Sequence, residues 1–376
     1  MTLLLPDPPA VRPTHAARLD VDLAAVALNT ATLARAARGA ALMAVVKADG
    51  FGLGAADVAR TALAHGATWL GVTSLREALD LRGAGIDAPV LSWLNPADPD
   101  LATAAATAGV DLAVPSLEHL AAVVAHGGPC PVRVHLHLDT GLARDGAAPQ
   151  TWLALCGAAR RAERAGRLRV VGVMGHLACA DEPGHPANAR GRAAFAHGVV
   201  VARAAGLRPQ VHHLAATSAT LTDADSHHDL VRVGAGLVGI DPTGTHRLAG
   251  ALTLTAPVVG LRRVPAGTPV GYGHSWVAPE ATTLALLPVG YADGLPRLAS
   301  GRAAVLLGGR RCAVVGRISM DQAVVAAPAS TRLGDVATVL GPGHAGEPTV
   351  HDWAAWSGTL PHEVLTGLGA RPRVTR

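Results

Sequence analysis

Several residue classes are scarce in this 376-residue sequence, and each scarcity excludes a class of protein. Charged residues make up 16% and aromatic residues 3%, whereas 49% of the residues are apolar. A chain this long and this apolar can bury a sizeable core, which excludes an intrinsically disordered protein. No stretch approaches the roughly 18–20 uncharged apolar residues that span a bilayer, and the first residues lack the basic start of a secretory signal. We therefore expect a cytoplasmic protein without a membrane partner.

Cysteine is also scarce, and the four cysteines are scattered along the chain. Cys130, Cys156, Cys179 and Cys312 form no C-x-x-C pair, so they indicate neither a disulfide framework nor a zinc site. The net charge of +4 does not point to nucleic acid, because the densest basic run, over residues 160–169, carries no interleaved aromatic residues. We expect this run to lie on a solvated helix face.

Lysine is the scarcest side chain, because Lys47 stands alone against 31 arginines. Arginine can replace lysine wherever a positive charge suffices. It cannot replace a lysine that must form a Schiff base, because the guanidinium stays charged and is a poor nucleophile. The single lysine is therefore a candidate for covalent chemistry, the alternative being a surface position that survived by chance.

From about residue 40 the sequence alternates short apolar runs with alanine-rich segments of helical length. Such alternation implies a parallel sheet, and eight units within about 200 residues fit a (β/α)8 barrel better than an open sheet. The expected strands are 42–48, 68–74, 89–93, 110–116, 132–139, 170–176, 211–216 and 230–236. The expected helices between them are 54–65, 75–82, 117–125, 151–165 and 189–205, and the connections before residues 110 and 230 are short.

After about residue 245 the pattern changes to β-rich runs broken by glycine and proline, without a long helical period. We expect an N-terminal arm over residues 1–17, a barrel over residues 18–245 and a mostly β domain over residues 246–376. A short strand near residues 18–22 could belong to that β domain.

Reactive side chains follow the ends of several strands, where barrel enzymes carry their active sites. Lys47 ends the first apolar run and is followed by a glycine-rich loop in which backbone can approach a ligand. Each reactive residue alone could be structural, but their shared end of the barrel favours one active site. The residues at the later strand ends are Asp139, Arg144, His176, Thr217, Ser218, Arg232 and Gly234.

Seven sequence segments occur in an order that resembles the motif series of the alanine racemase family. The segments are AVVKADGFGLG, HLDTGLAR, GHLACADE, VRVGAG, GYGHSW, GYADGLPR and GRISMDQ. The resemblance covers the chain from about residue 18 to its last dozen residues. It implies an enzyme that depends on pyridoxal 5'-phosphate (PLP), with a PLP-binding barrel and a C-terminal β domain. It also implies a small amino-acid substrate and a homodimer whose active site is completed by the other subunit.

The resemblance implies two catalytic bases on opposite faces of the substrate. Lys47 would hold PLP as a Schiff base and act as one base, and Tyr272, from the other subunit, would act as the second. Arg232 would face the pyridine nitrogen of PLP, and His176 would hydrogen-bond Arg232. Lysine and tyrosine suit such proton transfer if nearby cations lower their pKa values toward the working pH.

Further residues follow from the same resemblance. Arg144 and the backbone N–H of Met320 would hold the substrate carboxylate. The remaining cofactor-binding residues, largely for the phosphate, would be Thr217, Ser218, Gly234 and His362. The corridor toward the site would be lined by Asp181, Tyr291, Arg297 and Arg317.

Five positions depart from the family pattern and concern PLP affinity, turnover and substrate range. Phe51, Val238 and His362 stand where tyrosines are common, and Ala216 replaces the asparagine before the phosphate-binding hydroxyl. His137 stands where many members carry a carbamylated lysine. Because imidazole cannot carry that carbamate, the substrate-binding arginine needs another positioning partner.

Other functions stay open at this point. The chain could racemise another amino acid, or bind PLP with little turnover, and a two-domain PLP decarboxylase is disfavoured because its expected Cys-containing loop is absent. A metal-dependent hydrolase is the alternative from another class, because His135 and His137 form an H-x-H motif to which His212, His213 and Asp139 could add ligands. We expect no metal, since H-x-H arises readily by chance among 18 histidines.

Overall fold

The computed structural model describes residues 16–368 and 373–375, and the chain divides into two compact units. The larger unit comprises residues 22–251. The smaller unit comprises the described residues up to 21 together with those from 252 onward. The arm expected over residues 1–17 lies outside the described residues as far as residue 15.

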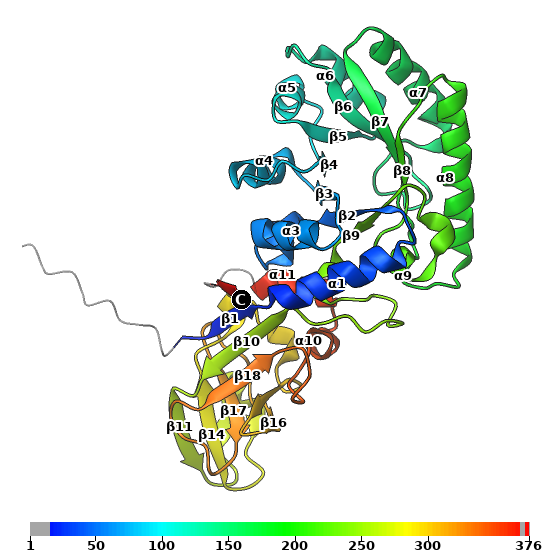
Figure 1. Cartoon of the computed structure of the whole chain (residues 1–376). Helices are drawn as coiled ribbons and strands as arrows, with labels where there is room; N and C mark the ends of the chain where they lie inside the picture. Colours follow the sequence, from blue (N-terminus) through cyan, green and yellow to red (C-terminus); the bar gives the residue numbers. More distant parts are fainter. Residues whose placement is uncertain (1–15, 369–372, 376) are drawn as a thin grey trace, which may run out of the picture. The chain divides into compact units, whose positions relative to one another are not determined.

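Eight parallel strands form the centre of the larger unit, and helices cover their outer side (Figure 1). These strands are β2 (Ala41–Val45), β3 (Trp69–Val72), β4 (Val90–Ser92), β5 (Val110–Val114), β6 (Val132–His137), β7 (Leu168–Met174), β8 (Val211–His213) and β9 (Leu230–Val233). Their order in the sheet is β8-β7-β6-β5-β4-β3-β2-β9. Backbone hydrogen bonds bridge the seam between β8 and β9, from Arg232 N to Ala215 O (3.0 Å) and from Asp229 N to His212 O (3.1 Å). The predicted (β/α)8 barrel is confirmed.

The barrel interior is filled by every second side chain of its strands, because successive residues of a strand point to opposite faces. Strand pairing aligns Met43 with Arg232 and Met174 with His213, so these side chains share the inner face. Fully burying a side chain of this size stabilises the fold by about 1.5–3 kcal/mol. The apolar part of the interior consists of Met43, Val45, Leu91, Ala113, Met174 and Leu230.

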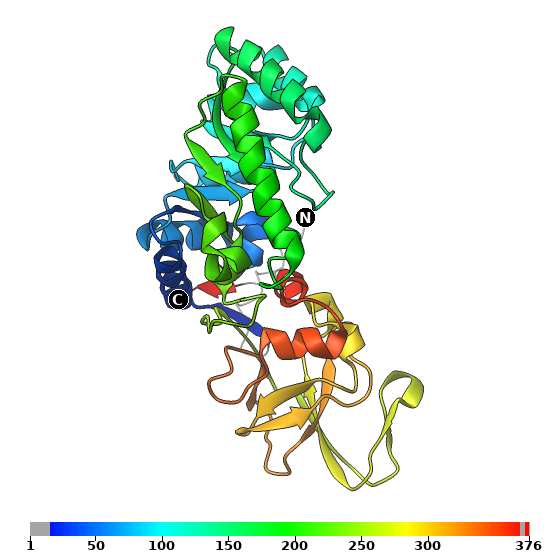
Figure 2. The same ribbon diagram turned by 90° about the vertical axis from the view of Figure 1, so that its right-hand side faces the viewer.

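Several helices of the larger unit begin at side-chain caps that the sequence carries. Ser74 forms a capping box with Glu77 at the start of α4, and Asp98 caps α5. The five predicted helices are present, four with ends shifted by one to three residues and α6 with the predicted ends, whereas α5 lies in the connection before residue 110 that was expected to be short. Figure 2 shows α8, the longest of these helices, along the outside of the barrel strands. The helices are α1 (Leu23–Ala36), α2 (Lys47–Phe51), α3 (Ala55–Ala64), α4 (Leu75–Gly83), α5 (Pro99–Thr107), α6 (Leu117–Ala125), α7 (Pro149–Arg164), α8 (Pro186–Ala204) and α9 (Thr217–Thr222), with 3-10 turns η1 (Ala224–Ser226) and η2 (Ala235–Val238).

The smaller unit is mostly β, as predicted. Its largest sheet has the order β16-β15-β18-β10-β1-β19, and two further sheets have the orders β11-β14-β17 and β12-β13. The first described strand, β1, pairs antiparallel with β10 and therefore belongs to this unit. The strands are β1 (Arg18–Val21), β10 (Leu252–Pro257), β11 (Gly260–Val264), β12 (Pro269–Val270), β13 (Trp276–Val277), β14 (Thr282–Leu287), β15 (Ala304–Leu307), β16 (Arg310–Ala313), β17 (Ala323–Ala327), β18 (Val336–Leu340) and β19 (Arg373–Thr375).

Two short helices of this unit were not predicted, namely α10 (Val350–Ser357) and α11 (Pro361–Gly367). Each has at most eight residues, too few for a clear helical period. A capping box between Thr349 and Asp352 starts α10, and Trp353 anchors it by donating Nε1–H to Val339 O at 2.8 Å. The 3-10 turns of this unit are η3 (Tyr272–His274), η4 (Tyr291–Asp293) and η5 (Arg297–Ala299).

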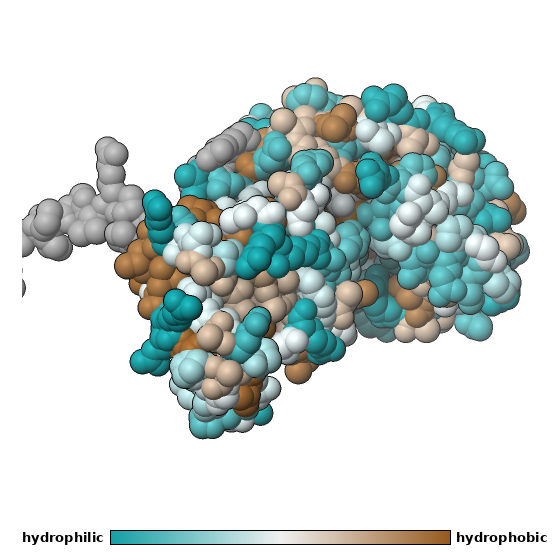
Figure 3. Space-filling model, turned by 90° about the horizontal axis from the view of Figure 1, so that it is seen from below, coloured by the Kyte–Doolittle hydropathy of each residue, from teal (hydrophilic) through white to brown (hydrophobic). Residues whose placement is uncertain are grey.

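No helix among the described residues is both long and apolar enough to cross a membrane. The face seen in Figure 3 mixes hydrophilic and hydrophobic residues. Isolated apolar side chains on a surface are normal in water-exposed proteins. Three exposed apolar or aromatic residues matter below because they lie on neighbouring loops of the smaller unit: Tyr272, Tyr291 and Met320.

Candidate active site

Lys47 lies just beyond the carboxyl end of β2 and begins a left-handed turn. Residues 48–52 all have positive φ, from 51° at Ala48 to 84° at Gly52. This conformation costs an ordinary L-residue about 1–2 kcal/mol, so Ala48 and Phe51 are strained. Asp49 offsets part of that cost by accepting the Ala55 N–H at Oδ1 (2.9 Å). The turn thus fixes the backbone of Lys47 at the mouth of the barrel.

Glu77 of α4 holds this turn from the neighbouring strand-helix unit. Its Oε1 accepts the N–H of Ala48 at 2.8 Å. Its Oε2 accepts the N–H of Thr73 (2.8 Å), the hydroxyl of Thr73 (2.6 Å) and the N–H of Ser74 (3.0 Å). Burial acts to raise the pKa of Glu77, but these hydrogen bonds outweigh it and hold that pKa below its ordinary value. Glu77 is therefore a fixed anion beside the lysine turn.

The pKa of the Lys47 amine lies below its ordinary value. Burial is the largest cause, the positive charge of Arg144 lowers the pKa further, and Glu77 acts in the opposite direction. A lowered pKa increases the fraction of neutral amine near pH 7, which is the form that attacks a carbonyl. The environment therefore suits Lys47 as a nucleophile and as a proton acceptor.

Arg232 of β9 is buried and held by hydrogen bonds from both terminal nitrogens. Nη1 donates to His213 O (2.9 Å) and His213 Nδ1 (3.0 Å), and Nη2 donates to Gly175 O (2.7 Å), Leu214 O (3.2 Å) and His176 Nδ1 (3.2 Å). Burial lowers the pKa of Arg232 to about 10, so the guanidinium is charged at neutral pH. Within the described part of the chain, no acceptor takes its Nε–H.

His176, at the end of β7, lies beside this guanidinium as a neutral ring. Burial lowers its pKa to about 3, and the charges of Arg232 and Arg144 contribute. Because Arg232 can only donate, His176 Nδ1 must accept, and the ring proton lies on Nε2. His176 can therefore donate from Nε2 to a further group.

Thr217 and the segment after β9 form a small cradle of backbone N–H groups. Thr217 Oγ1 accepts the N–H groups of Gly234 and Gly236, each at 3.3 Å. A Cβ at Gly234 would lie 2.9 Å from the Phe51 ring, and one at Gly236 would lie 2.9 Å from Thr217 Cγ2. Both glycines are therefore required by close packing, and their N–H groups hold the Thr217 hydroxyl at the end of β9. Ser218 follows Thr217 on α9 and is buried.

Arg144 lies on the loop after β6 and is exposed. Asp139 shapes this loop, because its Oδ1 accepts three successive N–H groups, those of residues 141–143, at 2.9–3.1 Å. His137 has Nδ1 3.4 Å from Asp145 Oδ2. The anionic group nearest this histidine is thus Asp145, one residue beyond Arg144.

The smaller unit places its predicted residues on three adjoining loops. Tyr272 lies in η3 with 70% of its surface exposed. A Cβ at Gly273 would lie 3.2 Å from the guanidinium carbon of Arg317, so these two loops pack together. Tyr291 N donates to Ser319 O at 3.0 Å, which brings the loop of Tyr291 against the segment that contains Met320. Tyr272, Tyr291, Arg317 and Met320 therefore belong to one loop cluster.

Three other predicted residues lie outside the groups described so far. Arg297 begins η5, and the neighbouring Ser300 joins that turn to the Arg317 loop by accepting the Ile318 N–H at 3.0 Å. His362 lies on α11. Asp181 is exposed on the loop between β7 and α8.

The histidines that suggested a metal site do not form one among the described residues, where no group of three potential ligands occurs. His135 Nδ1 contacts His213 Nε2 at 2.8 Å, and His135 Nε2 contacts Asp111 Oδ2 at 3.2 Å. His212 Nδ1 lies 2.6 Å from Asp229 Oδ2 at the other face of β8. His135 and His137 therefore have different partners, and so do His212 and His213.

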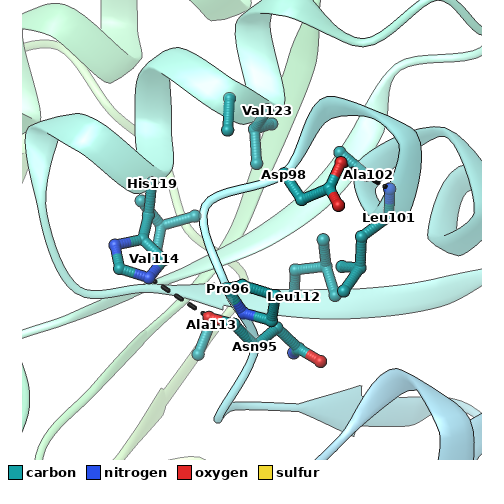
Figure 4. A pocket seen from close by; sticks show the side chains of 11 residues that line it. Asn95, Pro96, Asp98, Leu101, Ala102, Leu112, Ala113, Val114, His119 and Val123 are labelled. Atoms are coloured by element: carbon teal, nitrogen blue, oxygen red, sulfur yellow. Dashed lines mark hydrogen bonds between the residues drawn. The ribbon is translucent and has the colours of Figure 1, made fainter.

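A pocket of the larger unit, between β5, α5 and α6, lacks a set of reactive side chains like that around Lys47. Figure 4 shows that most of the side chains lining this pocket are apolar and that His119 is the histidine among them. The two ring nitrogens of His119 already contact Ser116 Oγ (2.9 Å) and Asn95 O (3.2 Å). We interpret His119 as a structural histidine.

Sequence reasoning missed two charged residues that support the site. Glu77 was visible as the fourth residue of an S-x-x-E capping box, but its bond to Ala48 N joins segments 29 residues apart. Asp111 was visible as a lone charge inside an apolar strand, VDLAV, which is a signal of a buried pair.

Comparisons with known proteins agree over the whole chain. Family models described as "Alanine racemase, N-terminal domain" and "Alanine racemase, C-terminal domain" match residues 21–242 and 251–376. An alanine racemase of Thermobifida fusca is 47% identical over 365 residues, covering 95% of this chain and 97% of that protein.

Solved structures give the same result. The alanine racemase of Streptomyces coelicolor A3(2) matches with a TM-score of 0.91 and 44% identity, covering 96% of this chain and 98% of that one. An alanine racemase of Bartonella henselae, solved with covalently bound pyridoxal phosphate, matches with a TM-score of 0.84 and 27% identity, covering 96% and 99%. Two family domains in the expected order, together with a close relative over nearly its full length, establish that this chain is a member of the alanine racemase family.

Proposed function

We propose that this chain interconverts L- and D-alanine with PLP bound to Lys47. The observation that carries the proposal is the setting of the single lysine. It lies at the barrel mouth on a fixed turn, has a lowered pKa, and shares that mouth with the buried Arg232. Family membership supplies the reaction, and the Bartonella henselae relative was solved with PLP covalently bound.

The residues present fit PLP at three points. The Arg232 Nε–H is a donor to which no described residue offers an acceptor, and the pyridine nitrogen of PLP is an acceptor. The Thr217 hydroxyl, whose oxygen accepts the N–H groups of Gly234 and Gly236, has its own hydrogen available for a phosphate oxygen. Lys47 supplies the amine. Ser218 and His362 are proposed as further cofactor contacts, and Phe51 contributes packing without a hydroxyl.

PLP, when bound through an imine, spreads the charge that remains on the substrate Cα after proton removal. The chain's own groups then move the proton. Lys47 would remove or return it on one face of Cα once the substrate amine has displaced the Lys47 amine from PLP, and Tyr272 would do so on the other face. A charged Arg232 would donate to the pyridine nitrogen without protonating it, which would limit charge withdrawal to what racemisation needs. Neutral His176 keeps Arg232 in place through Nδ1.

The substrate carboxylate is proposed to bind Arg144 and the backbone N–H of Met320. The exposure of Tyr272 and Met320, 70% and 54%, supports a homodimer in which the loop cluster of one subunit completes the site of the other. The entrance is proposed to be lined by Asp181, Tyr291, Arg297 and Arg317. We also propose that the enzyme works in the cytoplasm.

The test is chiral amino-acid analysis after the full chain is incubated with PLP and a panel of single L-amino acids. We expect D-alanine to form fastest, and borohydride to fix PLP at Lys47. Lys47→Arg keeps the charge without a nucleophilic amine, so racemisation should fall by about a thousandfold or more and no PLP should be fixed. Faster racemisation of another amino acid would reassign the substrate. PLP binding without turnover would reduce the protein to a PLP carrier, and a chain that takes up no PLP refutes the proposal.

A further inference from the structure

Five polar side chains cross the barrel interior in a connected line that ends at Arg232. Arg133 donates Nε and Nη2 to the two oxygens of Asp111, at 2.6 and 3.1 Å. Asp111 Oδ2 lies 3.2 Å from His135 Nε2, and His135 Nδ1 lies 2.8 Å from His213 Nε2. His213 Nδ1 lies 3.0 Å from Arg232 Nη1. We call these residues the polar line.

The polar line runs from the amino ends of the strands toward their carboxyl ends. Arg133 and Asp111 are the second residues of β6 and β5, and His213 is the last residue of β8. His135 and His213 are fully buried, and Asp111 is 2% exposed. Barrel interiors are normally packed with branched apolar side chains, and buried polar groups are costly unless they are paired. A buried line of this length therefore calls for a role.

The direction of each hydrogen bond in the polar line follows from its two charged ends. Arg232 has no acceptor, so His213 Nδ1 must be unprotonated and accept. Burial and the charge of Arg232 hold the pKa of His213 well below its ordinary value, so the ring is neutral and its proton lies on Nε2. His213 Nε2–H then donates to His135 Nδ1, which leaves the His135 proton on Nε2, facing Asp111. Both rings have a single tautomer.

The fold provides a fitted slot for the central ring of the polar line. A Cβ at Gly172 of β7 would overlap the His135 ring, 2.7 Å from Cε1 and closer still to Nδ1. On another side Trp69 meets the ring edge to face, with ring centroids 5.6 Å apart. The imidazole is thus confined, and His135 cannot change partners by a simple rotation.

We propose that Asp111 is a positioning residue for the reaction, acting through His135 and His213 to fix Arg232 where it meets the cofactor. This inference rests on the proposed function, because Arg232 is assigned there to the pyridine nitrogen. Arg133 keeps Asp111 ionised from the amino-terminal side. His135, the first histidine of the H-x-H motif that suggested a metal site from sequence, is thereby explained as part of this line.

The anion matters because the opposite arrangement of protons would disturb the site. Without a negative charge at Asp111, His135 can carry its proton on Nδ1 and donate to His213 Nε2. His213 would then carry its proton on Nδ1, directed at the N–H groups of Arg232. Two donors cannot share a hydrogen bond, so the guanidinium would lose that contact and move.

The first experiment needs no activity, and its variants serve only to assign the two rings. The apo protein is labelled with ¹⁵N-histidine, and long-range nitrogen–hydrogen correlations assign the ring tautomers, with His135→Gln and His213→Gln identifying the two rings. We expect both rings to carry their proton on Nε2. An Nδ1-protonated tautomer in either wild-type ring overturns the proposal.

The second experiment compares Asp111→Asn with Glu163→Gln, a matched loss of charge on the outer helix α7. Glu163 accepts from Arg160 (2.8 Å) and from Val170 N (3.1 Å), outside the polar line. We expect Asp111→Asn to populate the Nδ1-protonated form of His213 and to shift the visible PLP band. Its kcat should fall about tenfold, the equivalent of one lost hydrogen bond, with KM near the wild-type value. Glu163→Gln should change none of these.

The two experiments separate this proposal from the proposed function. A wild-type chain without PLP uptake or racemisation would refute the proposed function, while the tautomers would still show whether the polar line is directed. If the enzyme racemises alanine but Asp111→Asn leaves the tautomers and the PLP band unchanged, the positioning role of Asp111 fails alone. Equal effects of Glu163→Gln would also overturn that role.

Discussion

Replacing Thr217 by valine tests the phosphate cradle, because the change keeps shape and burial while removing one hydroxyl. In the structure Thr217 Oγ1 accepts from Gly234 N and Gly236 N at 3.3 Å, and no described residue accepts its own O–H. That hydrogen is therefore available to a phosphate oxygen. A hydrogen bond to a charged group contributes about 1.5–3 kcal/mol. The Kd for PLP should thus rise about 10- to 150-fold in Thr217→Val.

The matched control is Thr220→Val, three residues further along α9. Thr220 is also buried, but its hydroxyl already donates to Ala216 O at 2.9 Å. Kd is measured by titrating each apo protein with PLP and with pyridoxal, which lacks the phosphate. Thr217→Val should weaken PLP binding and leave pyridoxal binding unchanged. The cradle assignment is refuted if both ligands weaken equally, or if Thr220→Val weakens PLP binding as much.

The remaining predictions concern the two proposed bases. Glu77→Gln removes an anion that raises the pKa of Lys47, so the pH profile for capture of PLP should move to lower pH, whereas Arg144→Gln removes a cation and should move it to higher pH. Capture rates of the apo proteins across pH measure this, and shifts in the same direction would contradict the charge assignment. Tyr272→Phe should slow racemisation by about 10²- to 10⁴-fold, while deuterium from solvent still enters the enantiomer that Lys47 serves. Wild-type racemisation rates in Tyr272→Phe would exclude Tyr272 as a base.

The barrel could be predicted from sequence because its strands are apolar runs and its longer helices repeat at regular intervals. The reacting groups could be placed at one mouth because strand ends meet there in any barrel of this kind. Short helices escaped prediction for a physical reason. In α5 and α10 the helix is fixed by a cap and by packing, as with Trp353 on Val339 O, and neither is visible in a periodic pattern.

The residues that hold the reacting groups in place were harder to predict than the reacting groups themselves. Glu77 and Asp111 act on residues far away in the sequence, and a one-dimensional pattern shows neither the partner nor the direction of a hydrogen bond. The H-x-H motif shows this limit most clearly. His135 and His137 are two residues apart and on one face of β6, yet one contacts His213 and Asp111 while the other lies 3.4 Å from Asp145.

The left-handed turn after Lys47 has a consequence for how this protein can evolve. At about 1–2 kcal/mol each, Ala48 and Phe51 together cost about 2–4 kcal/mol, against a typical net stability of about 5–15 kcal/mol for a folded domain. Substitutions that thin the apolar barrel would therefore put the lysine turn at risk before the rest of the fold. Glycine at position 48 or 51 would relieve the strain yet loosen the turn. The stability of the barrel and the placement of the Lys47 amine must therefore evolve together. A variant that loses barrel stability has little free energy left to hold the strained turn.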